Sequence, residues 1–192
     1  MKVYDAASIR NVAVVGHGGC GKTQLVSALL FSAGMVNRLG LVDEGTTVTD
    51  YDDEEIARKH TLGASLAFVE WNKTKVNLID TPGFGNFFAD VRAGLRVADG
   101  ALVVVDAVAG VEVQTEKAWA AAQELNLPRM VVLSRLDRVV YGAMDPKAGA
   151  CGSVMNVAAH SKLNHRASLA GGVLAGESAE LLVNFFKARR KK

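Results

Sequence analysis

Cysteine and long apolar runs are both scarce in this chain of 192 residues. Its two cysteines, Cys20 and Cys151, lie far apart, which excludes a disulfide framework and a paired-thiolate zinc site and agrees with a reducing compartment. The longest apolar runs, such as 101–105, are much shorter than the roughly 18 residues of a membrane span. The first five residues lack the apolar region of a signal peptide. We therefore expect a cytoplasmic protein with no membrane contact.

The chain also lacks a strong excess of charge of one sign, but only because the opposite net charges of two segments nearly cancel. Its formal net charge is +2. Residues 1–137 hold 13 Lys and Arg against 17 Asp and Glu, a net of −4, whereas residues 138–192 hold 9 against 3, a net of +6. This reversal predicts two segments with different partners, the basic one favouring RNA or another polyanion. A solvated basic helix end is the alternative explanation.

Glycine is plentiful, and its densest cluster has the pattern G-x-x-x-x-G-K-[ST] between an apolar stretch and a helix-like stretch. In this phosphate loop, the glycines let backbone N–H groups turn inward to bind an anion at a helix N-terminus. Lys22 is placed to reach the β- and γ-phosphates, and Thr23 to ligate Mg²⁺. A chance glycine-rich turn is the alternative. The predicted nucleotide-binding residues here are Gly16, His17, Gly18, Gly19, Cys20, Gly21, Lys22 and Thr23.

Apolar runs alternate with amphipathic stretches along the first 137 residues. The pattern predicts strands at 11–15, 65–71, 75–79, 101–105 and 130–133, helices at 22–33, 87–97 and 113–125, and an irregular acidic segment at 40–59. Continuous Val, Leu and Ile strands that alternate with helices indicate a three-layer α/β fold of the phosphate-loop type. In that fold a mainly parallel sheet is covered by helices on both faces, and ligands gather at the carboxyl ends of the strands.

A second half of the site follows the strand at 75–79. Asp80 is placed to hold a Mg²⁺ water, and Gly83 to present its N–H to a γ-phosphate, although Asp80 as a simple helix cap is the alternative. The polar segment 45–62 is of the kind that becomes ordered when a γ-phosphate and Mg²⁺ bind. Thr61 is its candidate metal-sensing hydroxyl. The predicted Mg²⁺ residues are therefore Thr23, Thr61 and Asp80.

Residues 8–138 resemble the nucleotide domain of translational GTPases, elongation factor G most closely. The resemblance rests on 11–17 leading into Gly21-Lys22-Thr23, on Arg58 and Thr61, on Asp80-Thr81-Pro82-Gly83, on 98–101 with 104–107, and on 110–115. It implies GTP binding with Mg²⁺ and, in intact members, ribosome-stimulated hydrolysis. The predicted partners are thus guanine nucleotide and the ribosome, with no contact to DNA.

Three departures from that family bear on chemistry. Where members carry a histidine that orders the attacking water, this chain has Phe84, which has no hydrogen-bonding group, so hydrolysis should be slow. The guanine-reading motif Asn-Lys-x-Asp becomes Ser134-Arg135-Leu136-Asp137, which keeps the carboxylate but weakens the expected affinity. The closing elements of the family are not recognisable after Arg138. We therefore predict a GTP-binding domain at 1–137 and a different segment at 138–192.

The segment 138–192 resembles the C-terminal part of tRNA-specific adenosine deaminase, notably at 138–145, 147–157, 163–166 and 181–190. The resemblance implies RNA contacts at Asp145, Lys187, Arg189 and Arg190, and thus tRNA as a partner. The deaminase motifs His-x-Glu and Pro-Cys-x-x-Cys are missing, so we expect neither zinc nor deamination. Strands within 139–143 and 167–173 and a helix at 177–190 are predicted to supply the final strand and helix of the GTPase sheet, or else to form a separate lobe.

The sequence thus predicts a Mg²⁺-dependent GTP-binding domain with weak or slow hydrolysis. Two other interpretations stay open at this stage. One is a deaminase-derived RNA-binding fragment without a zinc site. The other is a chimeric chain with no physiological activity.

Overall fold

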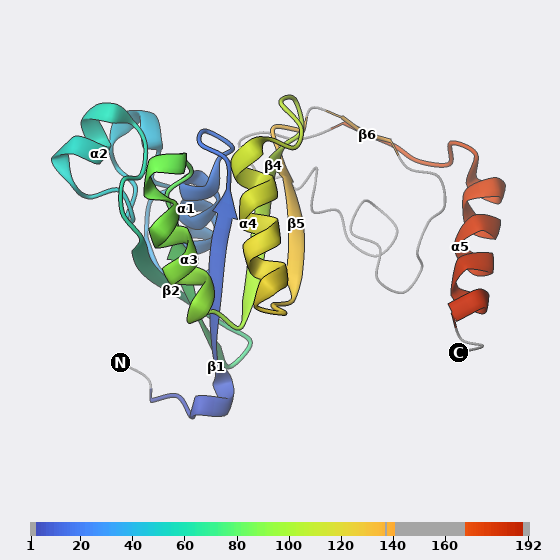
Figure 1. Cartoon of the computed structure of the whole chain (residues 1–192), viewed down its shortest axis with the longest axis horizontal. Helices are drawn as coiled ribbons and strands as arrows, with labels where there is room; N and C mark the ends of the chain where they lie inside the picture. The colour runs from blue at the N-terminus through green and yellow to red at the C-terminus, as the bar shows by residue number, and fades with distance from the viewer. Residues whose placement is uncertain (1–2, 137, 141–167, 190–192) are drawn as a thin grey trace. The chain divides into compact units, whose positions relative to one another are not determined.

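The chain divides into two compact units, Met1–Ser134 and Arg135–Lys192. The structure, a computed structural model, describes residues 3–136, 138–140 and 168–189 (Figure 1). The first unit holds strands β1 (Ile9–Gly16), β2 (Ser65–Trp71), β3 (Thr74–Asp80), β4 (Gly100–Asp106) and β5 (Arg129–Ser134), α-helices α1 (Lys22–Ser32), α2 (Asp53–Arg58), α3 (Phe88–Arg96) and α4 (Val113–Glu124), and 3₁₀ turns η1 (Ala6–Ser8), η2 (Val42–Glu44) and η3 (Gly85–Phe87). The second holds β6 (Arg138–Val140), β7 (Ser168–Ala170) and α5 (Ala175–Arg189). No helix in these described ranges has the length and apolarity needed to cross a bilayer.

The strands of the first unit form one sheet in the order β2-β3-β1-β4-β5. All neighbours are parallel except β2 and β3, which form an antiparallel hairpin. Asn72 and Lys73 close that hairpin with φ values of 45° and 63°, the left-handed pair that matches the twist of the strands. The predicted mainly parallel sheet is therefore confirmed.

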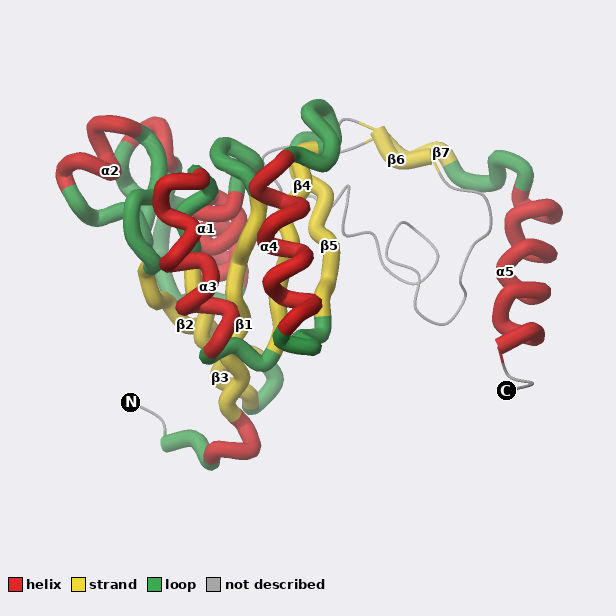
Figure 2. The backbone as a smooth tube through the Cα atoms, viewed as in Figure 1, coloured by secondary structure: helices red, strands yellow, loops and turns green. Residues whose placement is uncertain are grey.

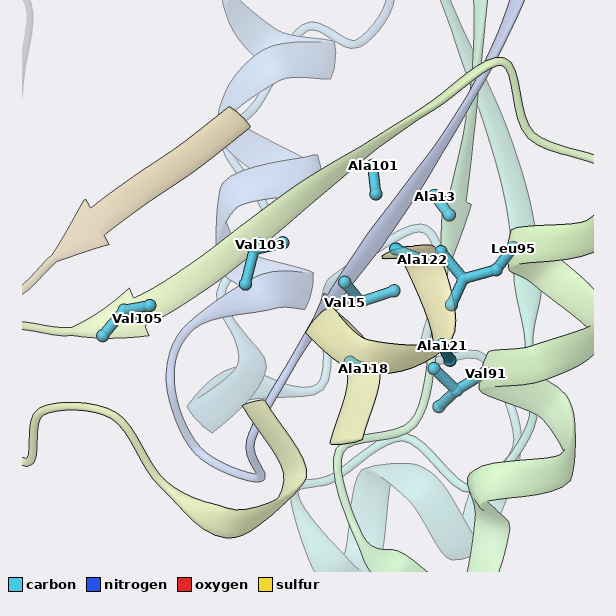
Figure 3. Packing of buried hydrophobic residues seen from close by; sticks show 10 residues of the cluster. All are labelled: Ala13, Val15, Val91, Leu95, Ala101, Val103, Val105, Ala118, Ala121 and Ala122. Atoms are coloured by element: carbon cyan, nitrogen blue, oxygen red, sulfur yellow. The ribbon is translucent and has the colours of Figure 1, made fainter. Parts of the chain in front are cut away.

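The core lies on both faces of this sheet, because successive strand residues point to opposite sides. Even-numbered residues of β1 and β4 pack with α1, and odd-numbered ones pack with α3 and α4. Figure 2 shows α3 and α4 on one side of the strands and α1 on the other. The cluster under α3 and α4 (Figure 3) consists of Ala13, Val15, Val91, Leu95, Ala101, Val103, Val105, Ala118, Ala121 and Ala122. The predicted three-layer fold class is confirmed.

The parallel register brings the carboxyl ends of β1, β3, β4 and β5 to one edge of the sheet. Val14 of β1 lies opposite Asp80 of β3, and Asp106 of β4 lies opposite Ser134 of β5. The phosphate-loop sequence leaves β1 at this edge and enters α1 at Lys22. Motifs that are far apart in sequence therefore meet at a single edge.

The second unit corrects one prediction about the sheet. The predicted strands at 139–143 and 167–173 correspond to the shorter β6 and β7, which pair in parallel with each other from Arg138↔Ser168 to Val140↔Ala170. Within the described ranges, the tail therefore adds no strand to the five-stranded sheet. A three-residue strand makes few ladder hydrogen bonds, and β6 makes them with β7 in its own unit. The helix predicted at 177–190 is present as α5, and its predicted role in closing the sheet stays a prediction.

Candidate nucleotide-binding site

The phosphate loop has a backbone that only glycine tolerates at two positions. Gly16 has a φ of 146°, and a Cβ at this residue would clash with the carbonyl oxygen of Val104. Gly21 has a φ of 91° and immediately precedes α1. Side-chain-bearing residues rarely adopt such values, so these glycines set the path of the loop. The loop leads directly into the N-terminus of α1, where free backbone N–H groups favour an anion.

Lys22 and Cys20 are two buried side chains of this loop. The Lys22 ammonium donates a hydrogen bond of 2.7 Å to the carbonyl oxygen of His17. Burial raises the pKa of the Cys20 thiol, so Cys20 is a neutral packing residue. His17 Nε2 lies 3.4 Å from a carboxylate oxygen of Glu112, just before α4. The loop is thus held by a contact within itself, from Lys22 to His17, and by a contact from His17 to Glu112.

The three predicted Mg²⁺ residues lie together in a buried group of oxygen atoms. The hydroxyl oxygens of Thr23 and Thr61 are 3.0 Å apart. Thr61 donates to Asp50 at 2.8 Å, and Thr49 donates to Asp80 at 2.8 Å. All five side chains are buried. The sequence did not single out Thr49 or Asp50, whose only signal was their place in the polar segment 45–62.

The donor set of this group fits Mg²⁺. One carboxylate oxygen of Asp80 and one of Asp50 are buried and have no hydrogen-bond partner among the described residues. Burial raises the pKa of Asp80 to about 6, against the lowering effect of the Thr49 hydroxyl, and burial also raises the pKa of Asp50. Carboxylate and hydroxyl oxygens are ligands that Mg²⁺ prefers, and a divalent cation would offset the cost of burying these carboxylates.

The acidic segment is more regular than the sequence predicted. It contains helix α2, which begins after Asp52, whose side chain accepts a hydrogen bond from the Glu54 N–H. Acidic residues in the first turn favour the helix because of its dipole. The buried carboxylate of Glu55, within α2, accepts from the N–H groups of Leu62 and Gly63, which follow the helix. This contact fixes the backbone next to Thr61.

The turn after β3 packs directly on the phosphate loop. The Thr81 hydroxyl donates to the Val14 carbonyl oxygen at 2.7 Å and so anchors the turn to β1. A Cβ on Gly83 would come within 2.6 Å of the Gly18 backbone nitrogen and would also clash with the Lys22 ammonium. The Phe84 ring lies against Gly18, and its centroid is 4.8 Å from that of the His60 ring. The predicted second motif therefore reaches the phosphate loop.

The predicted base-reading residues are only partly within the described chain. The Ser134 hydroxyl donates to the Cys20 carbonyl oxygen at 2.7 Å, so the end of β5 is bonded to the phosphate loop. Arg135 follows with a φ of 55°. Asp137 lies outside the described residues, as do Asp145 and Arg190 of the predicted RNA contacts. Lys187 and Arg189 belong to α5, and their predicted contacts stay predictions.

A parallel sheet with a glycine loop, a buried lysine and a hydroxyl–carboxylate group at its carboxyl edge defines a phosphate-loop nucleotide-binding domain. The family model of the elongation factor Tu GTP binding domain matches residues 7–168. The chain belongs to this family. The match runs past Arg138, where the sequence predicted a change of family. The deaminase resemblance of the tail stays a prediction.

Known proteins similar to the chain include translation factors. It is 45% identical over 133 residues to the mitochondrial ribosome-releasing factor 2 of Candida albicans, covering 69% of this chain and 16% of that protein. It is 45% identical over 129 residues to an elongation factor G-like protein of Mycobacterium tuberculosis, covering 67% of this chain and 18% of that protein. A protein of Thermus thermophilus with a known crystal structure is 48% identical with a TM-score of 0.66, covering 69% of this chain and 20% of that one.

These matches confirm the predicted elongation-factor-G-like GTPase domain. The chain spans less than one fifth of the length of these curated relatives, 16% and 18% in the two cases above.

Proposed function

We propose that this chain binds GTP together with Mg²⁺ and hydrolyses the nucleotide slowly. The observation that carries the proposal is that Lys22, Thr23, Thr61 and Asp80 lie together at the phosphate loop. The Thr23 hydroxyl is 3.0 Å from that of Thr61, and both Thr23 and Lys22 interact with the Asp80 carboxylate. Each of these residue types has a role toward a nucleoside triphosphate. Together they form both halves of a phosphate and metal site.

The role of each residue in this site follows from the chemistry of its functional group. N–H groups of the loop 16–23 bind the phosphate oxygens, and the Lys22 ammonium turns from the His17 carbonyl oxygen toward the β- and γ-phosphates. The hydroxyls of Thr23 and Thr61 and the Asp80 carboxylate would hold Mg²⁺, Asp80 through a water. When bound, the metal neutralises charge on the phosphate oxygens. The Gly83 N–H donates to the γ-phosphate.

Slow turnover follows from Phe84. Hydrolysis requires a water held in line with the γ-phosphate, and a phenyl ring neither accepts nor donates a hydrogen bond to hold it. Phe84 therefore packs against the loop at Gly18 without orienting the nucleophile. This predicts a protein that stays in its triphosphate-bound state for long periods.

Guanine selection is assigned to Ser134, which ends β5, and to Arg135 and Asp137, which follow it in the sequence. The Asp137 carboxylate would accept from the N–H groups of the guanine ring, and the Arg135 guanidinium would stack on the base. The Ser134 hydroxyl is bonded to the Cys20 carbonyl oxygen and contributes position rather than base contact. We therefore expect GTP to be preferred over ATP, with modest affinity.

The ribosome is the proposed larger partner, and tRNA stays a predicted one. The support for the ribosome is the similarity to ribosome-releasing factor 2 and to an elongation factor G-like protein. We assign nucleotide binding to residues 1–137 and treat 138–192 as a separate basic segment. That assignment is supported by the charge reversal and by the pairing of β6 with β7.

A fluorescent mant-GTP titration tests the proposal directly. Binding should be saturable, stronger with Mg²⁺ than with a chelator, and displaced by unlabelled GTP at lower concentration than by ATP. Preferential displacement by ATP would refute guanine selection. Binding that ignores Mg²⁺ would refute the metal site.

A further inference from the structure

The ring of Phe84 is in contact with the ring of a histidine, His60. The His60 ring lies 4.8 Å from the Phe84 ring, centroid to centroid, at an interplanar angle of 62°. Phe84 in turn lies against Gly18 of the phosphate loop. We call residues 45–62 the first switch segment and residues 80–84 the second switch segment. The imidazole that the resembled family carries at the position of Phe84 thus has a counterpart, His60, in the first switch segment, in contact with the Phe84 ring.

The position of His60 is set by its neighbours on the chain. It immediately precedes Thr61, whose hydroxyl lies 3.0 Å from that of Thr23. Phe84 immediately follows Gly83, which packs on Gly18 and Lys22. The two rings therefore meet where both switch segments reach the loop that holds the phosphates.

The hydrogen bonding of His60 leaves it suited to accept from a water. His60 Nδ1 lies 2.8 Å from the Arg58 carbonyl oxygen. A carbonyl oxygen only accepts, so the hydrogen of the neutral ring is on Nδ1, and Nε2 is then an acceptor. The Arg58 contact also fixes the plane of the ring. His60 is half-buried, so its environment is accessible to water.

We propose that His60 is the residue that orients the attacking water for GTP hydrolysis in this chain. This inference rests on the proposed function, because it requires bound GTP. The water oxygen forms a bond to the γ-phosphorus as the bond from that phosphorus to the β-γ bridging oxygen breaks, and the electron pair leaves on GDP. The water carries one hydrogen bond to His60 Nε2 during attack, and its proton ends on the released inorganic phosphate.

Two substitutions at one position separate this role from packing. His60→Phe keeps a ring against Phe84 but removes the acceptor, whereas His60→Gln keeps an acceptor without the ring. We expect His60→Phe to lower the single-turnover rate at saturating GTP and Mg²⁺ by at least about tenfold. This loss is smaller than the rate enhancement that a well-positioned catalytic base contributes. The mant-GTP dissociation constant should stay within about twofold, because the water is not a ground-state contact. His60→Gln should retain most of the rate.

A double substitution tests whether an imidazole at position 84 restores the hydrolysis rate that His60→Phe removes. In His60→Phe/Phe84→His the imidazole moves to the other switch, and the rate should return to at least that of the parent. Unchanged hydrolysis in His60→Phe, or loss of GTP affinity in that variant alone, would overturn the role of His60. Failure of the parent to bind mant-GTP would instead refute the proposed function, so the two failures are distinguishable.

Discussion

The Thr49 hydroxyl donates a 2.8 Å hydrogen bond to the fully buried carboxylate of Asp80. Thr49 lies in the acidic segment and Asp80 ends β3, so this contact joins the first switch segment to the sheet before any metal binds. It leaves the second Asp80 oxygen without a partner among the described residues. In the proposed function, the first oxygen is held by the protein and the second is the one that would accept from a Mg²⁺-bound water.

Thr49→Val should destabilise the protein while preserving the shape of the side chain. Removing the donor leaves a buried carboxylate oxygen unpaired, which costs about 1–3 kcal/mol. The midpoint of urea denaturation in a chelator should fall accordingly. Thr49→Ser is the matched control and should keep most of the stability. Equal midpoints for the valine variant and the parent would show that the bond contributes nothing.

Asp80 should make the stability of the metal-free protein depend on pH. Its pKa is about 6 in the fold, against an ordinary value of 3.8. A raised pKa means that the folded state holds the proton more tightly, so this contribution is fully present below about pH 4 and is lost as pH rises through about 6. The loss corresponds to about 3 kcal/mol. Asp80→Asn should abolish this part of the pH profile of urea denaturation, whereas Asp43→Asn, at an exposed position, should not.

Lys22→Ala should remove most of the affinity for GTP. The ammonium is buried in the loop and bonded to the His17 carbonyl oxygen, and in the proposed function it binds the phosphates. We expect at least about a 100-fold increase in the mant-GTP dissociation constant, since charge-assisted contacts to phosphate are strong. Lys117→Ala, at an exposed position of α4, should bind like the parent. Undiminished binding by Lys22→Ala would contradict the phosphate-loop assignment.

Phe84→His should raise the rate of hydrolysis. The added imidazole would hold the attacking water in line with the γ-phosphate, a contribution that we expect to be about tenfold in the absence of any partner. Affinity should change little, because the ground-state phosphates do not use this residue. Single-turnover assays at matched occupancy measure the effect, with Phe84→Leu as the control. A mutant rate at or below the parent rate would show that Phe84 does not limit turnover.

The parts of this structure that the sequence predicted are those with local signals. The phosphate loop and the Asp80–Gly83 turn each follow a buried strand, and the parallel topology then places them at one edge. Thr49 and Asp50 were missed because the path of the acidic segment depends on long-range contacts, such as Thr61 with Thr23. The pairing of β6 with β7 joins segments that are distant in the sequence and leaves no periodic signal, so the sequence did not distinguish it from pairing with β5.

The hydrogen bond from Ser134 to the Cys20 carbonyl oxygen has a consequence for how a nucleotide is sensed. One end of this bond belongs to the strand that precedes the base-reading residues, and the other belongs to the loop that surrounds the phosphates. This 2.7 Å bond ties the position of the loop backbone to that of the strand end. In the proposed function, we therefore expect a substitution at Ser134 to change the binding of the phosphates as well as the preference for the base.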